Sequence, residues 1–536
     1  MKHITLFFIT LLIMVYSCVD DKGSYDFVPV NQVMIYELTE DGDTINGLRS
    51  WSKISMLDTL TYKVDLVGTL ADRDLGSYDF EWYLCYNNHT HETLSRTKDL
   101  EYFITQSPGT YGVYFQVTDR ETGMKWLASA NLTVTSPTTR GFLILGDTEE
   151  GIIGLDMLAM PVDKDTTMVE GVFDNSVHRI TDAEKLFFAG SYMGREDNQQ
   201  ALWITTKNGS YRLTNQDSIA LMGTVEDVKT IEVVYDHKTP IKVMDMAPHQ
   251  TTSNRSSSNR VYITEDFVFI NGITMTEYFV TPINRYDATS ETFFKPYPLA
   301  FCQGSYIRPQ DFMFYDMTND RFVMADGSYG VYSGKCDVIS NEYPDVDPFP
   351  WDQSTWPLSK PRDYKRTIVY GENSAEGSKG PSFAIMKDKD DNYFIYKFTV
   401  AKSGYWGVNV AKEACYDIDK SVATDFENAE HYLFASNNQT RLLYTVGSKL
   451  YVYDYSRQQF FEKDFTDEIT YLEGEYCSSS AKDQFLLATY SDVNKGTIYG
   501  LRVGGDPDKC EVIENPGAVW KTRLKVRDIE WKNTNR

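Results

Sequence analysis

Short apolar strands that come in pairs, joined by tight turns, are the sequence feature that most limits how this chain can fold. The clearest pair lies at residues 441–454, where two apolar runs flank the turn Gly447-Ser448. Two β-forming runs around a glycine-containing turn predict a β-hairpin. Similar pairs recur at irregular intervals from Gly141 onward, and no helix-period stretch of convincing length interrupts them. The sequence therefore predicts an all-β fold.

The number and spacing of these strand groups favour one architecture for residues 141–536. About seven groups, at roughly 50–57 residues each, come close to known propeller repeat lengths. The last candidate strand, residues 525–531, could close a ring by pairing with the first group. We therefore predict a β-propeller of about seven blades, and a pair of extra β-sandwiches is the alternative. No WD-repeat or kelch signature recurs, so the prediction rests on strand spacing.

Residues 27–137 show a pattern that predicts one β-sandwich. Alternating or β-rich runs follow one another there, with turn residues between them. In the most specific stretch, Pro108-Gly109 sets a turn and alternate residues from Tyr111 to Val117 share one face. Trp82 lies in an upstream run and could fill the centre of the sandwich. A short polar junction at residues 136–139 separates this block from the next.

The first 17 residues are typical of an export signal. A short polar start precedes an almost wholly apolar run at residues 6–15, which is too short for a stable membrane-spanning anchor. The run ends in Val15-Tyr16-Ser17-Cys18, which resembles a bacterial lipobox, in which the cysteine is diacylated and becomes the new N-terminus. We predict that Cys18 carries this lipid, which would attach the chain lastingly to a membrane. The alternative is an ordinary signal peptide with an incidental cysteine.

An acidic tether, residues 18–26, begins at this cysteine. Its sequence, with Asp20-Asp21-Lys22-Gly23 followed by Tyr25-Asp26, resembles the export signal that sends Bacteroidetes lipoproteins to the outer face of the outer membrane. The same string resembles the mature start of the PKD-like lipoprotein family of that phylum. The sandwich block is similar to the PKD-type immunoglobulin-like fold, over about a fifth of the chain.

Composition narrows the range of partners. The formal net charge is −25, and both nucleic acid and anionic lipid require a basic face on a protein that binds them. We therefore expect no nucleic acid partner, and membrane attachment only through the lipid anchor. The 37 Tyr and 29 Phe residues are typical of a β-rich chain, whereas the 7 His residues leave few of the commonest acid–base side chains.

Six cysteines follow Cys18, at positions 85, 302, 336, 415, 477 and 510. An even number in an exported chain permits disulfides, in any of several pairings. Buried free thiols, which behave as small apolar side chains, are the alternative. The wide spacing lacks the Cys-x-x-Cys pattern of zinc sites.

Two polar motifs are weak candidates for binding metals. His89 and His91 lie in a polar loop without a third ligand nearby, so we interpret them as solvated loop residues. Residues 388–392 start like a calcium-binding loop, but Tyr393 stands where such a loop requires Gly, and the late Glu is missing. We interpret this stretch as a charged hairpin turn, and we predict no metal site.

The sequence gives little support for catalysis. Gly-x-Ser-x-Gly, His-Glu-x-x-His and glycine-rich phosphate-binding motifs are absent. We therefore predict no catalytic residue and no cofactor other than the lipid on Cys18. A glycan-active enzyme with its site on a propeller face is the alternative, because such sites draw single residues from distant blades.

A Pro-rich loop at residues 342–361 is the stretch that best predicts a ligand-binding surface. It carries several acids and four aromatic residues, Tyr343, Phe349, Trp351 and Trp356. Prolines lower the entropy of the unfolded chain, so the loop can present rings without a regular element. Exposed Trp and Tyr are common anchors for sugars and peptides. We predict that these four rings bind ligand, and the alternative is that they pack back against the propeller.

The PKD-like resemblance implies a place in the cell for such a protein. It implies an outer-membrane lipoprotein that faces the cell exterior and serves a nutrient-uptake system, with a TonB-dependent (SusC-like) transporter and a SusD-like lipoprotein as partners. We expect a non-enzymatic accessory protein that binds glycan or oligopeptide fragments or scaffolds the assembly. An independent adhesin is a further alternative.

Overall fold

The structure is a computed structural model of the chain. It describes residues 31–533 except 40–41, 57, 71–73, 87–89, 107–108, 136–137, 139, 162–164, 174–178, 190–200, 214–224, 228–240, 248–258, 273–280, 303–310, 329–330, 361–364, 375–380, 404–406, 436–438, 475–482 and 507. The predicted leader, Cys18 and the acidic tether lie outside the described residues. The chain divides into two compact units, Met1–Val134 and Thr135–Arg536.

All regular structure in the described part is β-structure, apart from three short 3-10 turns. These turns are η1 (Leu75–Ser77), η5 (Gln353–Thr355) and η7 (Phe426–Asn428). None of the described segments is a helix of the length and hydropathy needed to cross a membrane. The predicted all-β class is confirmed.

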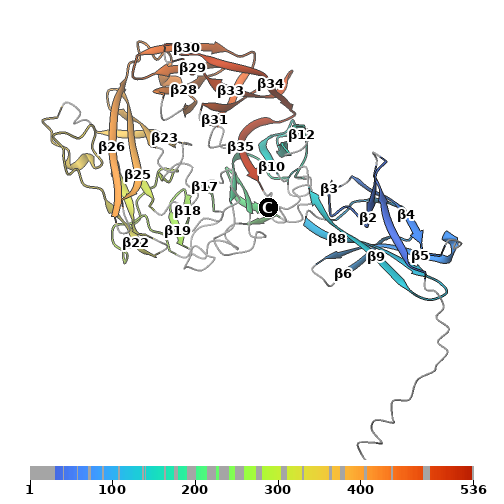
Figure 1. Cartoon of the computed structure of the whole chain (residues 1–536). Helices are drawn as coiled ribbons and strands as arrows, with labels where there is room; N and C mark the ends of the chain where they lie inside the picture. Colours follow the sequence, from blue (N-terminus) through green and yellow to red (C-terminus); the bar gives the residue numbers. More distant parts are fainter. Residues whose placement is uncertain are drawn as a thin grey trace, which may run out of the picture. The chain divides into compact units, whose positions relative to one another are not determined.

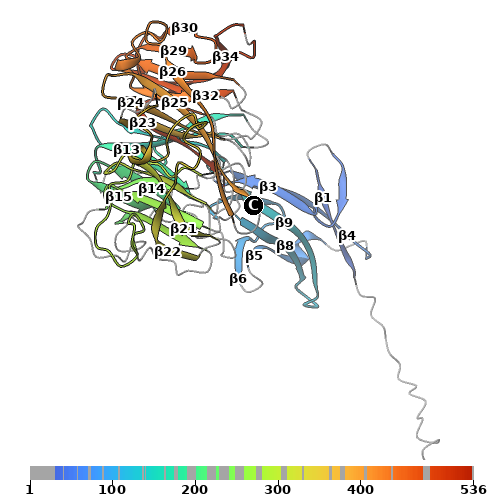
Figure 2. The ribbon, with the colours of Figure 1, turned by 90° about the vertical axis from the view of Figure 1, so that its left-hand side faces the viewer.

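The first unit is a sandwich of two antiparallel sheets; Figures 1 and 2 show β8 beside β9, and Figure 2 shows β1 beside β4. One sheet has the order β2 (Thr44–Asn46), β1 (Val33–Leu38), β4 (Thr59–Gly68), β7 (Leu100–Phe103). The other has the order β3 (Trp51–Ser55), β9 (Lys125–Thr135), β8 (Gly109–Asp119), β5 (Tyr78–Tyr86), β6 (Thr90–Ser95).

The core of the sandwich forms because alternate residues of its strands face inward. On β8, the residues from Tyr111 to Val117 alternate between buried and half-buried, as predicted. Trp82 is fully buried, and its ring stacks on those of Phe115 and Tyr62, with centroid distances of 4.4 and 5.3 Å. The predicted central place of Trp82 is therefore confirmed.

The second unit contains seven antiparallel sheets in its described part, numbered here in chain order. Sheet 1 is β35 (Lys525–Asn533), β10 (Arg140–Asp147), β11 (Ile153–Ala159), β12 (Thr167–Val169). Sheet 2 is β13 (Ala183–Ala189), β14 (Ala201–Thr206), β15 (Gly209–Leu213), β16 (Val225–Asp227). Sheet 3 is β17 (Val243–Ala247), β18 (Asn259–Thr264), β19 (Val268–Gly272).

The remaining four sheets follow in the same way. Sheet 4 is β20 (Met313–Asp316), β21 (Arg321–Ser328), β22 (Val331–Val338). Sheet 5 is β23 (Arg366–Asn373), β24 (Ser382–Asp388), β25 (Tyr393–Ser403), β26 (Gly407–Ile418). Sheet 6 is β27 (His431–Phe434), β28 (Arg441–Val446), β29 (Lys449–Asp454), β30 (Gln459–Asp464). Sheet 7 is β31 (Glu468–Gly474), β32 (Gln484–Ser491), β33 (Lys495–Val503), β34 (Val512–Thr522).

The strands of the second unit are continuous apolar runs in the sequence, because both faces of each sheet are covered. On β10, Leu143 and Leu145 belong to the apolar cluster shared with sheet 2, whereas Phe142 and Ile144 belong to the one shared with sheet 7. Successive side chains of a strand point to opposite faces, so a strand covered on both sides is apolar at nearly every position. This explains why such runs dominate the sequence after Gly141.

Apolar clusters join each sheet of the described part to the next. Separate clusters lie between sheets 1 and 2, 2 and 3, 3 and 4, 4 and 5, 5 and 6, and 6 and 7. A further cluster joins sheet 7 to sheet 1, with Tyr471 and Leu486 on one side and Phe142 and Trp531 on the other. This succession makes the unit propeller-like.

The last strand of the chain completes the first sheet. β35 pairs antiparallel with β10 from Arg140↔Asn533 to Asp147↔Lys525, and Figure 1 shows the two strands side by side. A side chain at Gly146 would bring its Cβ within 2.5 Å of the Lys525 carbonyl oxygen, so this close approach requires glycine. The predicted pairing of the last strand with the first group is present.

We expect Trp531→Ala to destabilise the second unit by about 3–5 kcal/mol, because it removes a large buried ring. Trp531 is 3% exposed and contacts the ring of Phe142 edge-on at 4.9 Å. Urea unfolding measures the change. Tyr343→Ala is the control within the second unit, since Tyr343 is 66% exposed and its loss should change stability by less than about 0.5 kcal/mol. Equal effects of both substitutions would contradict a structural role for β35.

Candidate functional site

The structure places three of the four predicted ligand-binding rings inside the protein. Phe349, Trp351 and Trp356 are 0%, 4% and 7% exposed, whereas Tyr343 is 66% exposed. The loop that carries them, residues 341–360, runs between β22 and β23. Burial of three rings favours the alternative stated above, that they pack back against the fold. Of the four, Tyr343 alone is accessible to a ligand.

Two of the buried rings, Phe349 and Trp351, fill space between sheets 4 and 5. Phe349 stacks on Tyr396 of β25 at 4.0 Å between ring centroids. Trp351 meets Phe322 of β21 and Phe398 of β25 edge-on, at 5.4 Å from each. Aromatic pairs of this kind contribute about 0.5–1.5 kcal/mol each beyond the area they bury. The aromatic residues of the loop are therefore its anchors to the two sheets.

The ammonium group of Lys412, on β26, lies among these three rings. Its Nζ atom is 5.3 Å from the ring centre of Trp351, 5.7 Å from that of Phe349 and 5.8 Å from that of Trp356. Nζ also donates a hydrogen bond to the Asp347 carboxylate at 2.6 Å. Burial lowers the pKa of Lys412, and the ion pair with Asp347 acts in the opposite direction. The chain itself thus supplies the cation that such an aromatic group attracts.

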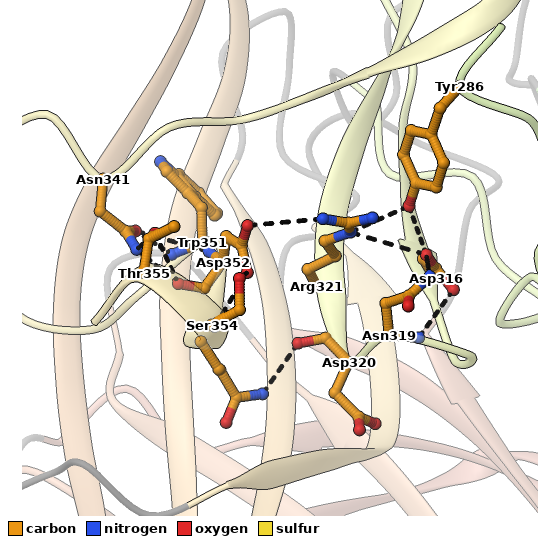
Figure 3. A network of polar contacts seen from close by, with 11 residues as sticks. Tyr286, Asp316, Asn319, Asp320, Arg321, Asn341, Trp351, Asp352, Ser354 and Thr355 are labelled. Atoms are coloured by element: carbon orange, nitrogen blue, oxygen red, sulfur yellow. Dashed lines mark hydrogen bonds and ion pairs between the residues drawn. The ribbon is translucent and has the colours of Figure 1, made fainter. Parts of the chain in front are cut away.

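A second cation, the half-buried Arg321 of β21, ties the loop to sheet 4 (Figure 3). Its guanidinium lies 3.6 Å from the Asp352 carboxylate and 3.7 Å from that of Asp316. Arg321 Nε donates to the Tyr286 hydroxyl at 3.0 Å, and the Tyr286 hydroxyl in turn donates to Asp316. Burial and the neighbouring Asp316 raise the pKa of Tyr286, so its hydroxyl keeps its proton.

Asn341 and Gln353 fix the backbone of the same loop. The Asn341 amide donates to the Asp352 carbonyl oxygen at 2.5 Å and accepts from the Trp351 backbone N–H at 2.7 Å. The Gln353 amide, which lies on η5, donates to the Asp320 carbonyl oxygen at 3.0 Å. These contacts, several of which are drawn in Figure 3, hold the loop in one conformation against the sheet.

A different group of polar side chains lies on the first strands of the sheets. Glu372 of β23 is 7% exposed and accepts hydrogen bonds of 2.9 Å from the Phe434 backbone N–H of β27 and from the Tyr370 hydroxyl. Burial raises the pKa of Glu372 to about 8, although these two hydrogen bonds lower it. The nearby charge of Glu473 raises it further. Glu372 therefore keeps a proton at neutral pH and links sheet 5 to sheet 6.

Asp528 of β35 makes a similar link. Its carboxyl accepts a hydrogen bond of 2.6 Å from the Leu186 backbone N–H of β13, which joins sheet 1 to sheet 2. Burial raises the pKa of Asp528 to about 8, and the charge of Glu473 adds to this effect, while Lys185 acts against it. Protonated carboxyls can act as general acids, but both of these hold a backbone amide of the next sheet.

These carboxyl groups follow β-bulges that recur among the first strands. Bulges occur near the start of β13, β17, β23, β31 and β35. On β23 and β31 the bulge is followed by a Tyr-x-Glu pair, Tyr370 with Glu372 and Tyr471 with Glu473. In each pair the hydroxyl donates a 2.9 Å hydrogen bond to a carboxyl oxygen. A bulge re-aims the side chains that follow it. The string Ile-x-Tyr-x-Glu, which both strands share, is the signal in the sequence that could have identified these pairs.

The remaining sequence candidates have ordinary structural places. Asp388 closes the hairpin turn predicted for its segment, since its Oδ1 accepts from the backbone N–H groups of Asp390 and Asn392 at 2.9 Å each. His91 lies on β6, so its assignment to a loop was wrong; its ring stacks on Tyr83 at 4.0 Å. His89 lies outside the described residues. Within the described ranges, no group of three or more His, Cys, Asp or Glu side chains could hold a metal ion.

The cysteines of the described part are free thiols. Cys302, Cys336 and Cys510 are buried, whereas Cys85 and Cys415 are partly exposed. Burial raises the pKa of Cys302 to about 12, which makes its thiol unreactive at neutral pH. Cys477 lies outside the described residues. For the described cysteines, the alternative of free thiols therefore holds.

We expect Lys412→Met to destabilise the second unit by about 3–5 kcal/mol, because it leaves the largely buried Asp347 without its ion-pair partner. The double variant Lys412→Met with Asp347→Asn should recover part of this loss, since it leaves no unpaired charge. Urea unfolding of the two single variants and the double variant measures the coupling. If the changes in the free energy of unfolding of the two single variants add up to that of the double variant, the ion pair does not hold the loop.

The raised pKa of Glu372 predicts that the stability of the folded chain depends on pH. Its pKa is raised in the folded chain, so its contribution is fully present below about pH 4.5 and is lost as the pH rises through about 8. The free energy of unfolding should fall over this interval, by up to about 1.4 kcal/mol per pH unit for this group. Urea unfolding of the wild type at pH 5, 6.5 and 8 measures the slope. We expect Glu372→Gln to flatten it.

Glu265→Gln is the matched control, because Glu265 is exposed. The control should leave the slope unchanged. The same slope in wild type and Glu372→Gln would contradict the buried, protonated state of Glu372.

Three solved structures can be aligned with much of this chain at low sequence identity. A quinonprotein alcohol dehydrogenase-like protein from Bacteroides thetaiotaomicron is 8% identical, with a TM-score of 0.35, over 93% of this chain and 99% of that one. The extracellular domain of a putative hybrid two component system from B. thetaiotaomicron is 10% identical, with a TM-score of 0.33, over 92% and 70%.

The third structure is the Cps50 (Swd1) beta-propeller domain of Myceliophteria thermophila, which is 10% identical, with a TM-score of 0.32, over 67% of this chain and 96% of that domain. All three TM-scores are low, so the fold described above rests on the strand pairing of this chain itself. No curated protein matches the chain. Residues 18–177 match the profile of the PKD-like family, and the chain therefore carries a PKD-like family domain in its N-terminal part.

Proposed function

We propose that this chain is a lipid-anchored protein on the outer face of the outer membrane and a non-enzymatic accessory component of a TonB-dependent, SusC/SusD-like nutrient importer. In this role it binds glycan or oligopeptide fragments or scaffolds the assembly. The observation that carries the proposal is the lipobox-like Cys18 with its acidic tether, directly followed by a PKD-like region.

We further propose that the second unit is a closed propeller of seven blades. Support comes from the seven successive sheets of the described part and from the apolar cluster between the last and the first of them. The pairing of β35 with β10 adds to this support, because it joins the two ends of the unit within one sheet. Closure of this kind gives β10 a partner strand and leaves only the short, protected edges that are typical of propeller blades.

The non-enzymatic part of the proposal rests on how the conspicuous polar groups are used. Glu372 and Asp528 have the raised pKa values expected of general acids, yet each accepts a backbone amide hydrogen bond from the next sheet. The Lys412 ammonium is enclosed by rings and by Asp347. Groups that hold the fold together in this way favour a structural role over catalysis.

A pull-down of the lipidated full chain from detergent-solubilised native membranes tests the proposal. We expect a TonB-dependent transporter and a SusD-like lipoprotein to co-purify with the wild type. Cys18→Ser should abolish membrane attachment, because it removes the acylated atom, and should reduce recovery of the transporter at least tenfold. Cys85→Ser, which changes a cysteine of the sandwich, is the control and should behave as wild type. A wild-type protein that is recovered alone, or that remains soluble, would contradict the proposal.

A further inference from the structure

Three apolar side chains of the loop at residues 341–360 point away from the fold. Tyr343, Val346 and Leu358 are 66%, 80% and 85% exposed, and together they are called the loop tip here. Single exposed apolar residues are common on protein surfaces. Here three of them lie on one short loop, although the other large apolar side chains of that loop are buried. Packing within the fold does not account for these three exposed side chains.

Two turns bring the loop tip together. The first closes with a hydrogen bond from the Asp347 backbone N–H to the Tyr343 carbonyl oxygen at 2.8 Å. The second closes with one from the Lys360 backbone N–H to the Pro357 carbonyl oxygen at 3.0 Å. Lys360 then joins the two turns, since its ammonium donates to the Asp345 carbonyl oxygen at 2.7 Å. The turn that carries Val346 and the turn that carries Leu358 are thus fixed to each other.

The underside of the loop holds the tip rigid. The buried rings of Phe349 and Trp351 pack against sheets 4 and 5, and Lys412 of β26 pairs with Asp347, which closes the first turn. A surface that is already ordered in the free protein loses little conformational entropy when a partner binds. The loop tip is therefore preorganised for an interaction.

The charge around the tip is negative. Glu342 is exposed, and the side chain of Asp345 is 96% exposed. Lys360, a cation of the second turn, has a side chain that is 22% exposed and is held against Asp345 and over the ring of Trp356. An acidic rim around apolar side chains is complementary to a surface that presents both basic and apolar residues.

We propose that the loop tip is a docking surface for a basic, apolar segment of a protein partner within the importer assembly, a proposal that rests on the function proposed above. A protein segment fits better than a sugar. Sugars are recognised by flat aromatic rings and hydrogen-bonding groups, and of the four aromatic residues of the loop only Tyr343 is exposed. Val346 and Leu358 offer apolar contact, which suits side chains rather than hydroxyl groups.

The test uses the lipidated full chain with Val346→Asp and Leu358→Asp combined. These changes place charge on the apolar tip, so recovery of the importer subunits in the native-membrane pull-down should fall about tenfold or more. Val493→Asp is the matched control, because Val493 is 89% exposed on the turn between β32 and β33 of sheet 7. The control should recover the subunits as the wild type does. Thermal unfolding should be unchanged in both variants.

A charge-reversal variant tests the acidic rim separately. Glu342→Lys combined with Asp345→Lys should lower recovery several-fold at low salt, and the difference from wild type should shrink as salt screens the charges. Unchanged recovery with both the apolar and the charge-reversed variants would overturn the docking surface, even if the importer complex itself is recovered.

A photo-crosslinking residue at position 346 in intact cells separates the two proposals. An adduct to a basic, apolar segment of an importer subunit supports both. An adduct to such a segment of another surface protein, with no importer recovered by the wild type, supports the docking surface and contradicts the importer role. No protein adduct at position 346, or protection of position 346 by added glycan alone, overturns the docking proposal.

Discussion

Backbone hydrogen bonding between β10 and β35 is the interaction on which the second unit depends. It gives sheet 1 its first strand from the far end of the chain. The same strand carries Trp531, which packs toward sheet 7, and Asp528, which accepts an amide hydrogen bond from sheet 2. β35 therefore completes sheet 1 and also connects that sheet to sheet 2 and to sheet 7. No other strand of the described part combines the two ends of the unit in this way.

Polar groups in this unit gather where one sheet or loop meets the next. Arg321 and Lys412 fix the long loop to sheets 4 and 5, and Glu372 links sheet 5 to sheet 6. Apolar contacts between sheets tolerate many combinations of residues, because different side chains of similar volume can fill the same space. Hydrogen bonds to a buried carboxyl have a fixed direction, so they set how one sheet is placed against the next.

Much of the fold could be predicted from local patterns, because strand periodicity and turn residues act over short distances. The hairpin at residues 441–454 and the central place of Trp82 follow directly from such patterns. The short strands β2, β3 and β6 were not predicted, since they are brief and half exposed. The assignment of His91 to a loop failed for this reason.

The candidate site was harder to predict because its parts come from distant segments. A sequence cannot show that Lys412, which lies far along the chain, places its ammonium among Phe349, Trp351 and Trp356. Without knowledge of that contact with Lys412, an aromatic-rich loop is equally consistent with a ligand-binding surface and with a buried anchor. The raised pKa values of Glu372 and Asp528 also depend on bulges and on neighbours from other sheets.

The placement of β35 has a consequence for how the protein is made. Sheet 1 lacks its first strand until the residues of β35 have been synthesised. Until then β10 is an open edge flanked by apolar residues, which is a template for aggregation. Bringing the ends together from an unstructured chain costs about 5 kcal/mol of loop entropy, and prior folding of the intervening sheets reduces this. The nascent chain therefore needs protection until β35 has paired, and loss of the β35 residues should harm the second unit more than a cut in an exposed loop.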